Sequence, residues 1–77
     1  MPSPATRAKL KRLGKVIAQW RREAGYSQED FGEACDLHRT YMGHIERGEA
    51  NVSFENLDRI ARAMSLTAGE LLMLAGV

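Results

Sequence analysis

Two short amphipathic helices joined by a tight turn are predicted between Ser27 and Glu46, and this segment constrains the fold more than any other part of the sequence. Ser27 is a suitable N-cap residue, and Asp30, three residues later, can bond back to the backbone of the cap. The helix that starts there should run to about Ala34 and bury Phe31 and Ala34. A second short helix should follow it closely.

The turn and the second helix complete this pattern. Asp36 occupies the turn, and Asp is one of the few residues with a β-carbon that tolerate a left-handed backbone. The second helix should begin near His38 and end near Arg47, with Met42 and Ile45, three residues apart, on its inward face. Two short helices at a steep angle form a helix-turn-helix, which places its second helix in the major groove of DNA.

Three further helices are predicted by the spacing of apolar residues and by capping residues. The first should end near Gly25, which suits the position after a helix. Ser53 should cap the fourth helix, and Thr67 with Glu70 should form a capping box that opens the fifth. The apolar residues expected to pack are Leu10, Leu13, Ile17, Trp20 and Ala24 in the first helix, Phe54, Leu57, Ile60, Ala61 and Met64 in the fourth, and Leu71, Leu72, Leu74 and Ala75 in the fifth.

A chain of 77 residues suffices for one small domain, close to the lower limit for a self-sufficient hydrophobic core. We expect an all-α fold of five compactly packed helices without strands, in which residues 1–4 form a flexible arm and residues 5–77 form a single domain. Self-association would add stability to a core of this size. We also expect no signal peptide and no membrane span, and the single cysteine suits a reducing compartment such as the cytoplasm.

The charged residues are distributed unevenly along the chain. The formal net charge is only +1, which by itself is weak support for a nucleic-acid partner. Residues 1–22, however, hold no acidic residue and seven basic ones, which are Arg7, Lys9, Lys11, Arg12, Lys15, Arg21 and Arg22. Such asymmetry favours a molecule that turns one face toward polyanions, although a solvated helix face explains Lys9 to Lys15 equally well.

Several sequence motifs occur in register around the predicted helix pair. Apolar residues at fixed offsets within Gln28 to Glu46 are Phe31, Cys35, Leu37, Met42 and Ile45, and the small Gly32 stands where the two helices should cross. With the tail Ile45-Glu46-Arg47-Gly48 and the segment 57–64, these residues resemble the phage-repressor and Cro-like helix-turn-helix proteins, the XRE family, over about residues 10–74. Asp36 replaces the glycine usual in that family, and Gly32 replaces the more common alanine. The run from Leu37 to Tyr41 looks like the controller proteins of restriction–modification systems, which are small dimeric regulators that bind promoter operators.

The resemblance implies a lambda-repressor-like domain that binds double-stranded operator DNA. Its base-reading residues would be Arg39, Thr40, His44 and Tyr41, and its phosphate-binding residues would be Ser27, Gln28, His38, Arg47 and Asn51. An arginine can bond guanine O6 and N7 with two parallel hydrogen bonds, which makes Arg39 the leading candidate. The resemblance also implies a partly buried ion pair between Arg21 and Glu46 that orients the second helix of the motif.

Cys35, His38 and His44 are the residues that would have to support a zinc site. Zinc needs three or four ligands with open geometry, whereas Cys35 is expected in the core and the histidines on the exposed face, so no metal site is predicted. Cys35 also lacks a helix N-terminus or a base that would activate it as a nucleophile. Without a Gly-rich phosphate loop or a cleft with paired carboxylates, we expect no enzyme, no cofactor and no small-molecule ligand.

The C-terminal segment from Leu71 to Val77 is apolar nearly all round. A single small domain cannot bury every face of it, so the excess should meet another chain, with Leu72, Met73 and Val77 as the best candidates. A homodimer through this helix would suit DNA reading, because two readers related by a two-fold axis match an inverted repeat. The alternative is a protein-interaction module, such as an antitoxin that covers a toxin partner.

Overall fold

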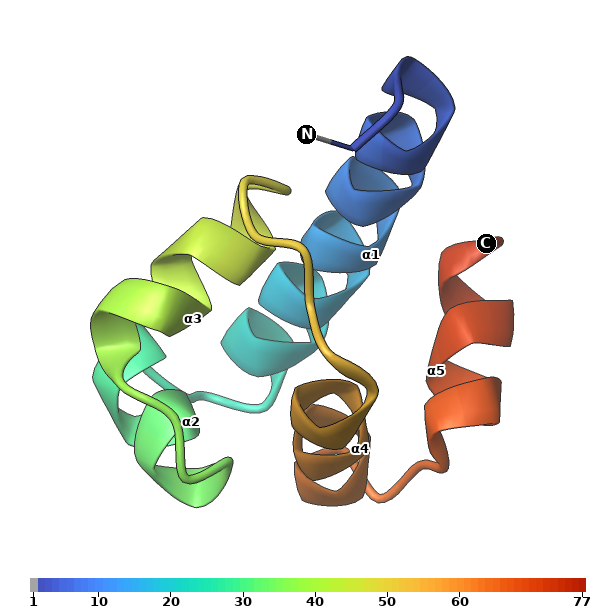
Figure 1. The fold of residues 1–77 in the computed structure, drawn as a ribbon. Coiled ribbons are helices and arrows are strands. Elements are labelled where there is room, and N and C mark those ends of the chain that lie inside the picture. The colour runs from blue at the N-terminus through green and yellow to red at the C-terminus, as the bar shows by residue number, and fades with distance from the viewer. Residues whose placement is uncertain (1) are drawn as a thin grey trace.

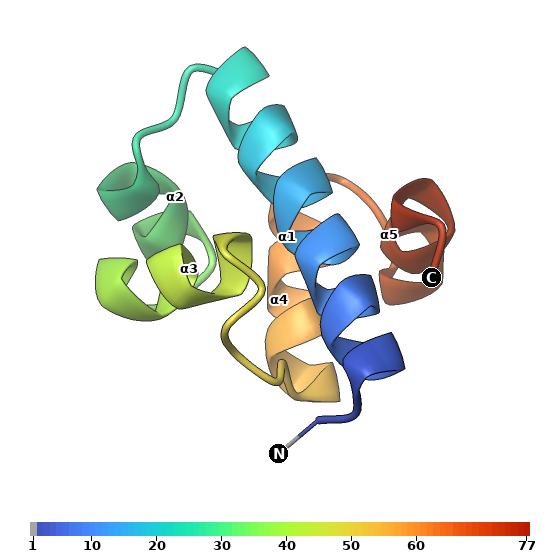
Figure 2. The same cartoon turned by 90° about the horizontal axis from the view of Figure 1, so that it is seen from above.

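The computed structural model describes residues 2–77 and contains five helices, which are α1 (Pro4–Glu23), α2 (Gln28–Ala34), α3 (Arg39–Glu46), α4 (Phe54–Ala63) and α5 (Ala68–Ala75). The predicted all-α class is confirmed, and no strand occurs among these residues. Figure 1 and Figure 2 both show α2 and α3 on one side of the long helix α1 and α5 on the other, with α4 between them. No helix within residues 2–77 combines the length and apolar character that a bilayer crossing requires.

Each helix begins at a side chain that accepts a hydrogen bond from the backbone. Ser27 caps α2, and the capping box predicted for Thr67 and Glu70 is present at the start of α5. His38 caps α3, because its Nδ1 accepts a hydrogen bond from the backbone N–H of Thr40 at 3.0 Å. These caps satisfy backbone donors that the first turn of a helix leaves without a partner.

The start of α1 lies within the segment predicted as a flexible arm. Pro4 is the first helical residue, where its missing N–H costs nothing, and the hydroxyl of Ser3 caps the helix by accepting from the backbone of Thr6 at 3.2 Å. Of the predicted arm, only Pro2 and the cap therefore precede the helix, and Met1 lies outside the described residues.

The turn between α2 and α3 has the conformation that the sequence predicted. Asp36 has a φ of 59°, in the left-handed region. A β-carbon at Gly32 would come within 2.6 Å of the carbonyl oxygen of Leu37, so a small residue is needed where the two helices meet. Gly14 has a similar role that its sequence context does not reveal, because a β-carbon there would collide with the backbone at the end of α3. These two glycines let α3 approach both of its neighbouring helices closely.

One core joins all five helices. Its buried side chains are Leu13, Ile17, Phe31, Cys35, Met42, Ile45, Leu57, Ile60, Ala61, Met64, Ala68, Leu71 and Ala75. Trp20 and Tyr26 pack against Phe31, with ring centroids 5.6 and 5.4 Å from it, and close the junction between α1 and α2. The inward face predicted for Met42 and Ile45 is confirmed.

Four residues predicted to be buried are exposed instead. Ala34 is exposed because the residues turned inward here are Phe31 of α2 and its C-cap Cys35. Ala24 is the C-cap of α1, beyond its last packed turn. Phe54, at the first position of α4, is 74% exposed, since the buried stripe of that helix starts only at Leu57. Leu74 is 60% exposed because α5 faces the core with other residues. Each error lies at the end of a helix or on its flank, where periodicity alone does not fix the orientation.

Candidate nucleic-acid interface

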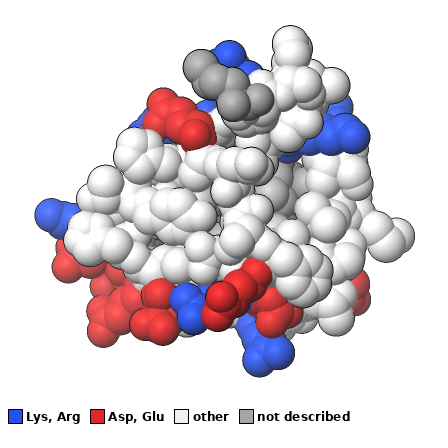
Figure 3. Space-filling view, in the orientation of Figure 1, with Lys and Arg blue, Asp and Glu red and all other residues white. Residues whose placement is uncertain are grey.

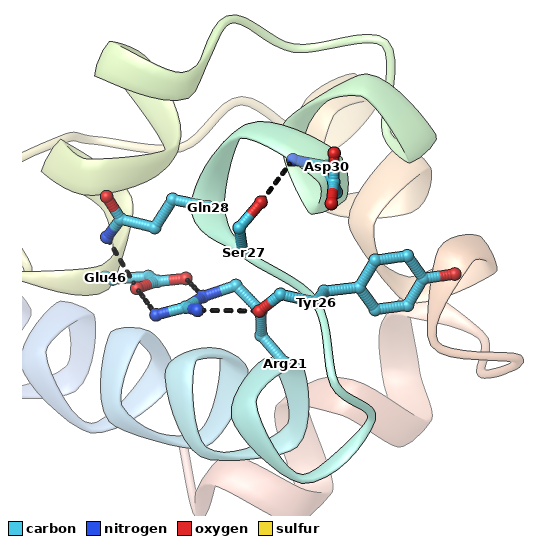
Figure 4. A network of polar contacts seen from close by, with 6 residues as sticks. All are labelled: Arg21, Tyr26, Ser27, Gln28, Asp30 and Glu46. Atoms are coloured by element: carbon cyan, nitrogen blue, oxygen red, sulfur yellow. Dashed lines mark hydrogen bonds and ion pairs between the residues drawn. The ribbon is translucent and has the colours of Figure 1, made fainter.

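A nearly buried ion pair fixes the end of α3 against α1. Arg21 donates from Nε to Oε2 of Glu46 at 2.7 Å and from Nη2 to Oε1 at 3.1 Å, and only 10% and 5% of the two side chains are exposed (Figure 4). Arg21 Nη1 also donates to the backbone oxygen of Tyr26, and Gln28 Nε2 donates to Glu46 Oε1 at 2.9 Å. The pairing implied by the family resemblance is therefore present, and it joins α1, the start of α2 and the end of α3.

The exposed side of α3 carries three of the four residues predicted to read bases. Arg39, Thr40 and His44 are exposed, and the opposite side of the helix buries Met42 and Ile45 in the core. Since His44 follows Thr40 by one helical turn, their side chains point the same way. A side chain on this helix can therefore extend outward from a backbone that the core and the ion pair hold in place.

Tyr41, the fourth predicted base reader, is partly buried against the core. Its hydroxyl accepts a hydrogen bond from Nδ2 of Asn56 in α4, at 3.3 Å. The phenol can still donate its own proton to a partner outside the protein. Tyr41 thus contributes to the packing between α3 and α4 in addition to any contact with DNA.

Two acidic residues that the sequence analysis did not single out lie beside the predicted DNA contacts. Glu29 of α2 accepts a hydrogen bond from Nη1 of Arg39 at 3.0 Å. Beyond the other end of α3, Oε1 of Glu49 is 2.9 Å from Nδ1 of His44 and accepts from Nε of Arg47 at 3.0 Å. The hydrogen bonds with His44 and then with Arg47 lower the pKa of the Glu49 carboxyl. No spacing rule for a single helix finds these pairs, because Glu29 lies on a different helix from Arg39 and Glu49 lies in the loop beyond the end of α3.

The predicted phosphate-binding residues have different surroundings. Ser27, His38, Arg47 and Asn51 are exposed, but the Ser27 hydroxyl and one ring nitrogen of His38 already serve as helix caps. Gln28 is partly buried, and its amide nitrogen is occupied by Glu46. Their role in binding phosphates stays a prediction, and for Gln28 it would require a change of partner.

The basic and acidic side chains, which are separated along the sequence, are also separated on the surface of the molecule. Figure 3 shows basic side chains over the beginning of α1, and mainly acidic side chains along the opposite edge, near α2 and α4. A potential of this kind orients an approaching polyanion before contact.

Cys35 behaves as part of the core. It is 2% exposed, and burial raises the pKa of its thiol to about 11. At neutral pH it is therefore a thiol without nucleophilic reactivity. The two histidines weighed with it as zinc ligands, His38 and His44, both lie on the exposed surface.

The C-terminal helix exposes apolar side chains, as predicted, but partly different ones. Met73 is 81% exposed and Val77 is 37% exposed, whereas Leu72 packs partly against the core. Leu74, expected to be buried, lies with the exposed group. Leu72 and Val77 also line a shallow apolar hollow, together with Leu10, Leu13, Val52, Leu57, Thr6 and Lys9.

The short helices α2 and α3 pack on each other across a tight turn, and the ion pair fixes the end of α3. Hydrogen-bonding side chains project outward from α3. This arrangement defines a helix-turn-helix domain. The family model described as helix-turn-helix (HTH_3) matches residues 17–71, and the chain belongs to this family.

Several relatives are restriction–modification control proteins. The chain is 42% identical over 61 residues to control protein C.BamHI of Bacillus amyloliquefaciens, a match that covers 78% of this chain and 75% of the relative. It is 41% identical over 61 residues to control protein C.MunI of a Mycoplasma species, covering 78% and 82%. The crystal structure of the restriction-modification controller protein C.AhdI from Aeromonas hydrophila superimposes with a TM-score of 0.78 at 36% identity, covering 83% of this chain and 97% of that one. The family resemblance found in the sequence, including its controller-protein branch, is confirmed.

Proposed function

We propose that this protein is a transcriptional regulator of the restriction–modification controller type, which binds an inverted-repeat operator in double-stranded DNA as a homodimer. The observation that carries the proposal is the outward projection of Arg39, Thr40 and His44 from a helix whose opposite side is buried. Similarity to the control proteins C.BamHI and C.MunI supports the controller role. The protein would act by binding DNA, without catalysis and without a cofactor, in the cytoplasm.

The apolar side chains of α5 support the homodimer. Met73, Leu74 and Val77 are exposed, and α5 lies on the other side of α1 from α3 (Figures 1 and 2). A partner that covers α5 would therefore leave the reading helix free. Two-fold symmetry through such a surface would present two copies of α3 to successive major grooves, about 34 Å apart.

Selection of bound duplexes from a random DNA pool tests the proposal directly. We expect recovery of an inverted repeat whose half-sites are centred about 10 base pairs apart. Recovery of no sequence, with binding equal to that of the starting pool, would refute sequence-specific regulation. Recovery of a single half-site without symmetry would refute the homodimer while leaving DNA recognition in place.

Replacement of Arg39 with alanine is expected to weaken binding to the recovered operator by about 1–3 kcal/mol and to relax the base preference at one position of each half-site. The reason is the loss of two parallel hydrogen bonds to guanine. Fluorescence anisotropy with the operator and with its single-base variants measures both effects. An equal loss on all duplexes would make Arg39 a phosphate contact.

The binding constant is expected to fall steeply as salt is added. Each phosphate neutralised by Lys or Arg releases counterions, so the slope of log K against log salt should be about −0.9 times the number of such contacts. Titrations at salt concentrations from about 50 to about 200 mM, where the effect is large, measure the slope. A flat response would exclude electrostatic contacts between the protein and the phosphates.

A further inference from the structure

Carboxylates pair with polar side chains of the reading surface at both ends of α3. At its beginning, Arg39 donates from Nη1 to Oε2 of Glu29 at 3.0 Å. Beyond its end, Oε1 of Glu49 lies 3.0 Å from Nε of Arg47 and 2.9 Å from Nδ1 of His44. The chain thus supplies its own anions to three of the side chains assigned above to DNA.

These carboxylates contribute little to the stability of the fold beyond the favourable position of Glu29 in the first turn of α2, where an acidic side chain complements the helix dipole. The side chains of Glu29 and Glu49 are 68% and 53% exposed, and exposed ion pairs contribute little to the stability of a fold. Glu46 provides the contrast, since its side chain is 5% exposed and its carboxylate accepts from both Arg21 and Gln28. Glu29 and Glu49 are therefore free to serve binding.

We propose that Glu29 and Glu49 determine specificity, because their carboxylates compete with DNA phosphates for the base-reading side chains of Arg39 and His44 and so weaken binding to random DNA more than binding to the operator. The proposal rests on the DNA-binding function proposed above. On random DNA, a phosphate that reaches Arg39 or His44 takes the place of the carboxylate, and the displaced carboxylate then faces the polyanion. The exchange of partners therefore yields little net attraction.

The operator places a different group opposite the arginine. A guanine edge offers the neutral acceptors O6 and N7, which do not repel a nearby carboxylate as a phosphate does. A guanidinium has five N–H donors, so Arg39 can bond two guanine acceptors and keep its hydrogen bond to Glu29. Recognition of guanine therefore keeps the Arg39–Glu29 ion pair, whereas non-specific binding of a phosphate breaks it.

Three variants and one matched control test the proposal. The variants Glu29→Gln, Glu49→Gln and the double replacement each remove carboxylate charge and keep the size of the side chain. Asp58→Asn is the control, because it also removes a carboxylate from an exposed arginine, Arg62 of α4, at 3.1 Å. It changes the net charge by the same amount as each single variant, away from α3.

Dissociation constants are measured by fluorescence anisotropy for the operator duplex recovered from the random pool and for a scrambled duplex of equal length. We expect each single variant to bind the scrambled duplex about tenfold more tightly, because no carboxylate then competes with the phosphates. A tenfold change in the dissociation constant corresponds to about 1.4 kcal/mol. The affinity for the operator should change less than about threefold, because an exposed ion pair is worth little free energy. Specificity would then fall, and Asp58→Asn should leave the ratio of the two constants unchanged.

Three results would overturn the proposal. Equal gains on both duplexes, matching those of Asp58→Asn, would reduce the effect to net charge. A loss of operator binding without a gain on the scrambled duplex would make Glu29 or Glu49 a positioning residue for its cation. Unchanged binding to both duplexes would leave the two carboxylates without a role in recognition. The proposed function fails separately, if the unaltered protein does not distinguish the two duplexes.

Discussion

Replacement of Glu46 with alanine is expected to lower the free energy of unfolding by about 3–5 kcal/mol. The variant leaves Arg21 charged, 10% exposed and without its carboxylate, and it takes the acceptor from the Gln28 amide. Unfolding in urea, followed by circular dichroism at one protein concentration, measures the loss, which in a domain of this size lowers Tm by more than about 10 °C.

Two further variants separate the buried pair from a general effect of charge. Asp58→Ala breaks an exposed ion pair with Arg62 and should change stability by less than about 1 kcal/mol. Arg21→Met combined with Glu46→Leu removes both buried charges and should regain much of the stability lost in the single variant. A Glu46→Ala protein as stable as Asp58→Ala would show that the pair does not hold α3 in place.

Replacement of both Met73 and Leu74 with aspartate is expected to give monomers that bind the inverted-repeat operator about 10²–10⁴-fold more weakly. Buried in an apolar interface, four new negative charges per dimer would be strongly unfavourable. A monomer loses the gain from occupying two linked half-sites, although each reading surface is unchanged. Analytical ultracentrifugation and anisotropy measure the two effects.

The control for this variant is Phe54→Asp, which places a charge on an apolar residue that is 74% exposed at the start of α4. The Phe54→Asp protein should remain dimeric. The α5 variant should bind a duplex with one half-site as tightly as the unaltered chain does. A dimeric α5 variant would place the interface elsewhere, and a monomeric Phe54→Asp protein would point to α4.

The order and approximate bounds of the five helices could be predicted because caps and apolar spacing agree locally. Ser53, Thr67 and the left-handed Asp36 all perform the roles expected of them. Burial at helix ends was less predictable, since Phe54 and Leu74 are apolar yet face away from the core. Their orientation depends on where neighbouring helices lie, which a helical period does not specify.

The candidate site shows the same division. Arg39, Thr40 and His44 could be placed on one outward face from their spacing, and the Arg21–Glu46 pair followed from the family resemblance. The contacts of Glu29 and Glu49 could not be predicted, because they depend on the angle at which α2 and the loop after α3 meet the reading helix. Gly14 was missed for a related reason, as its neighbour is a distant backbone segment.

The placement of α3 and α5 on opposite sides of α1 has a consequence for the spacing between operator half-sites. Because α1 packs against both helices, no flexible tether separates the part that reads DNA from the part proposed to join the two subunits. Each base pair inserted at the operator centre would rotate one half-site about the duplex axis by about 34–36°. A rigid pair of readers cannot follow that rotation, so the phase of the two half-sites should be as strictly required as their sequence.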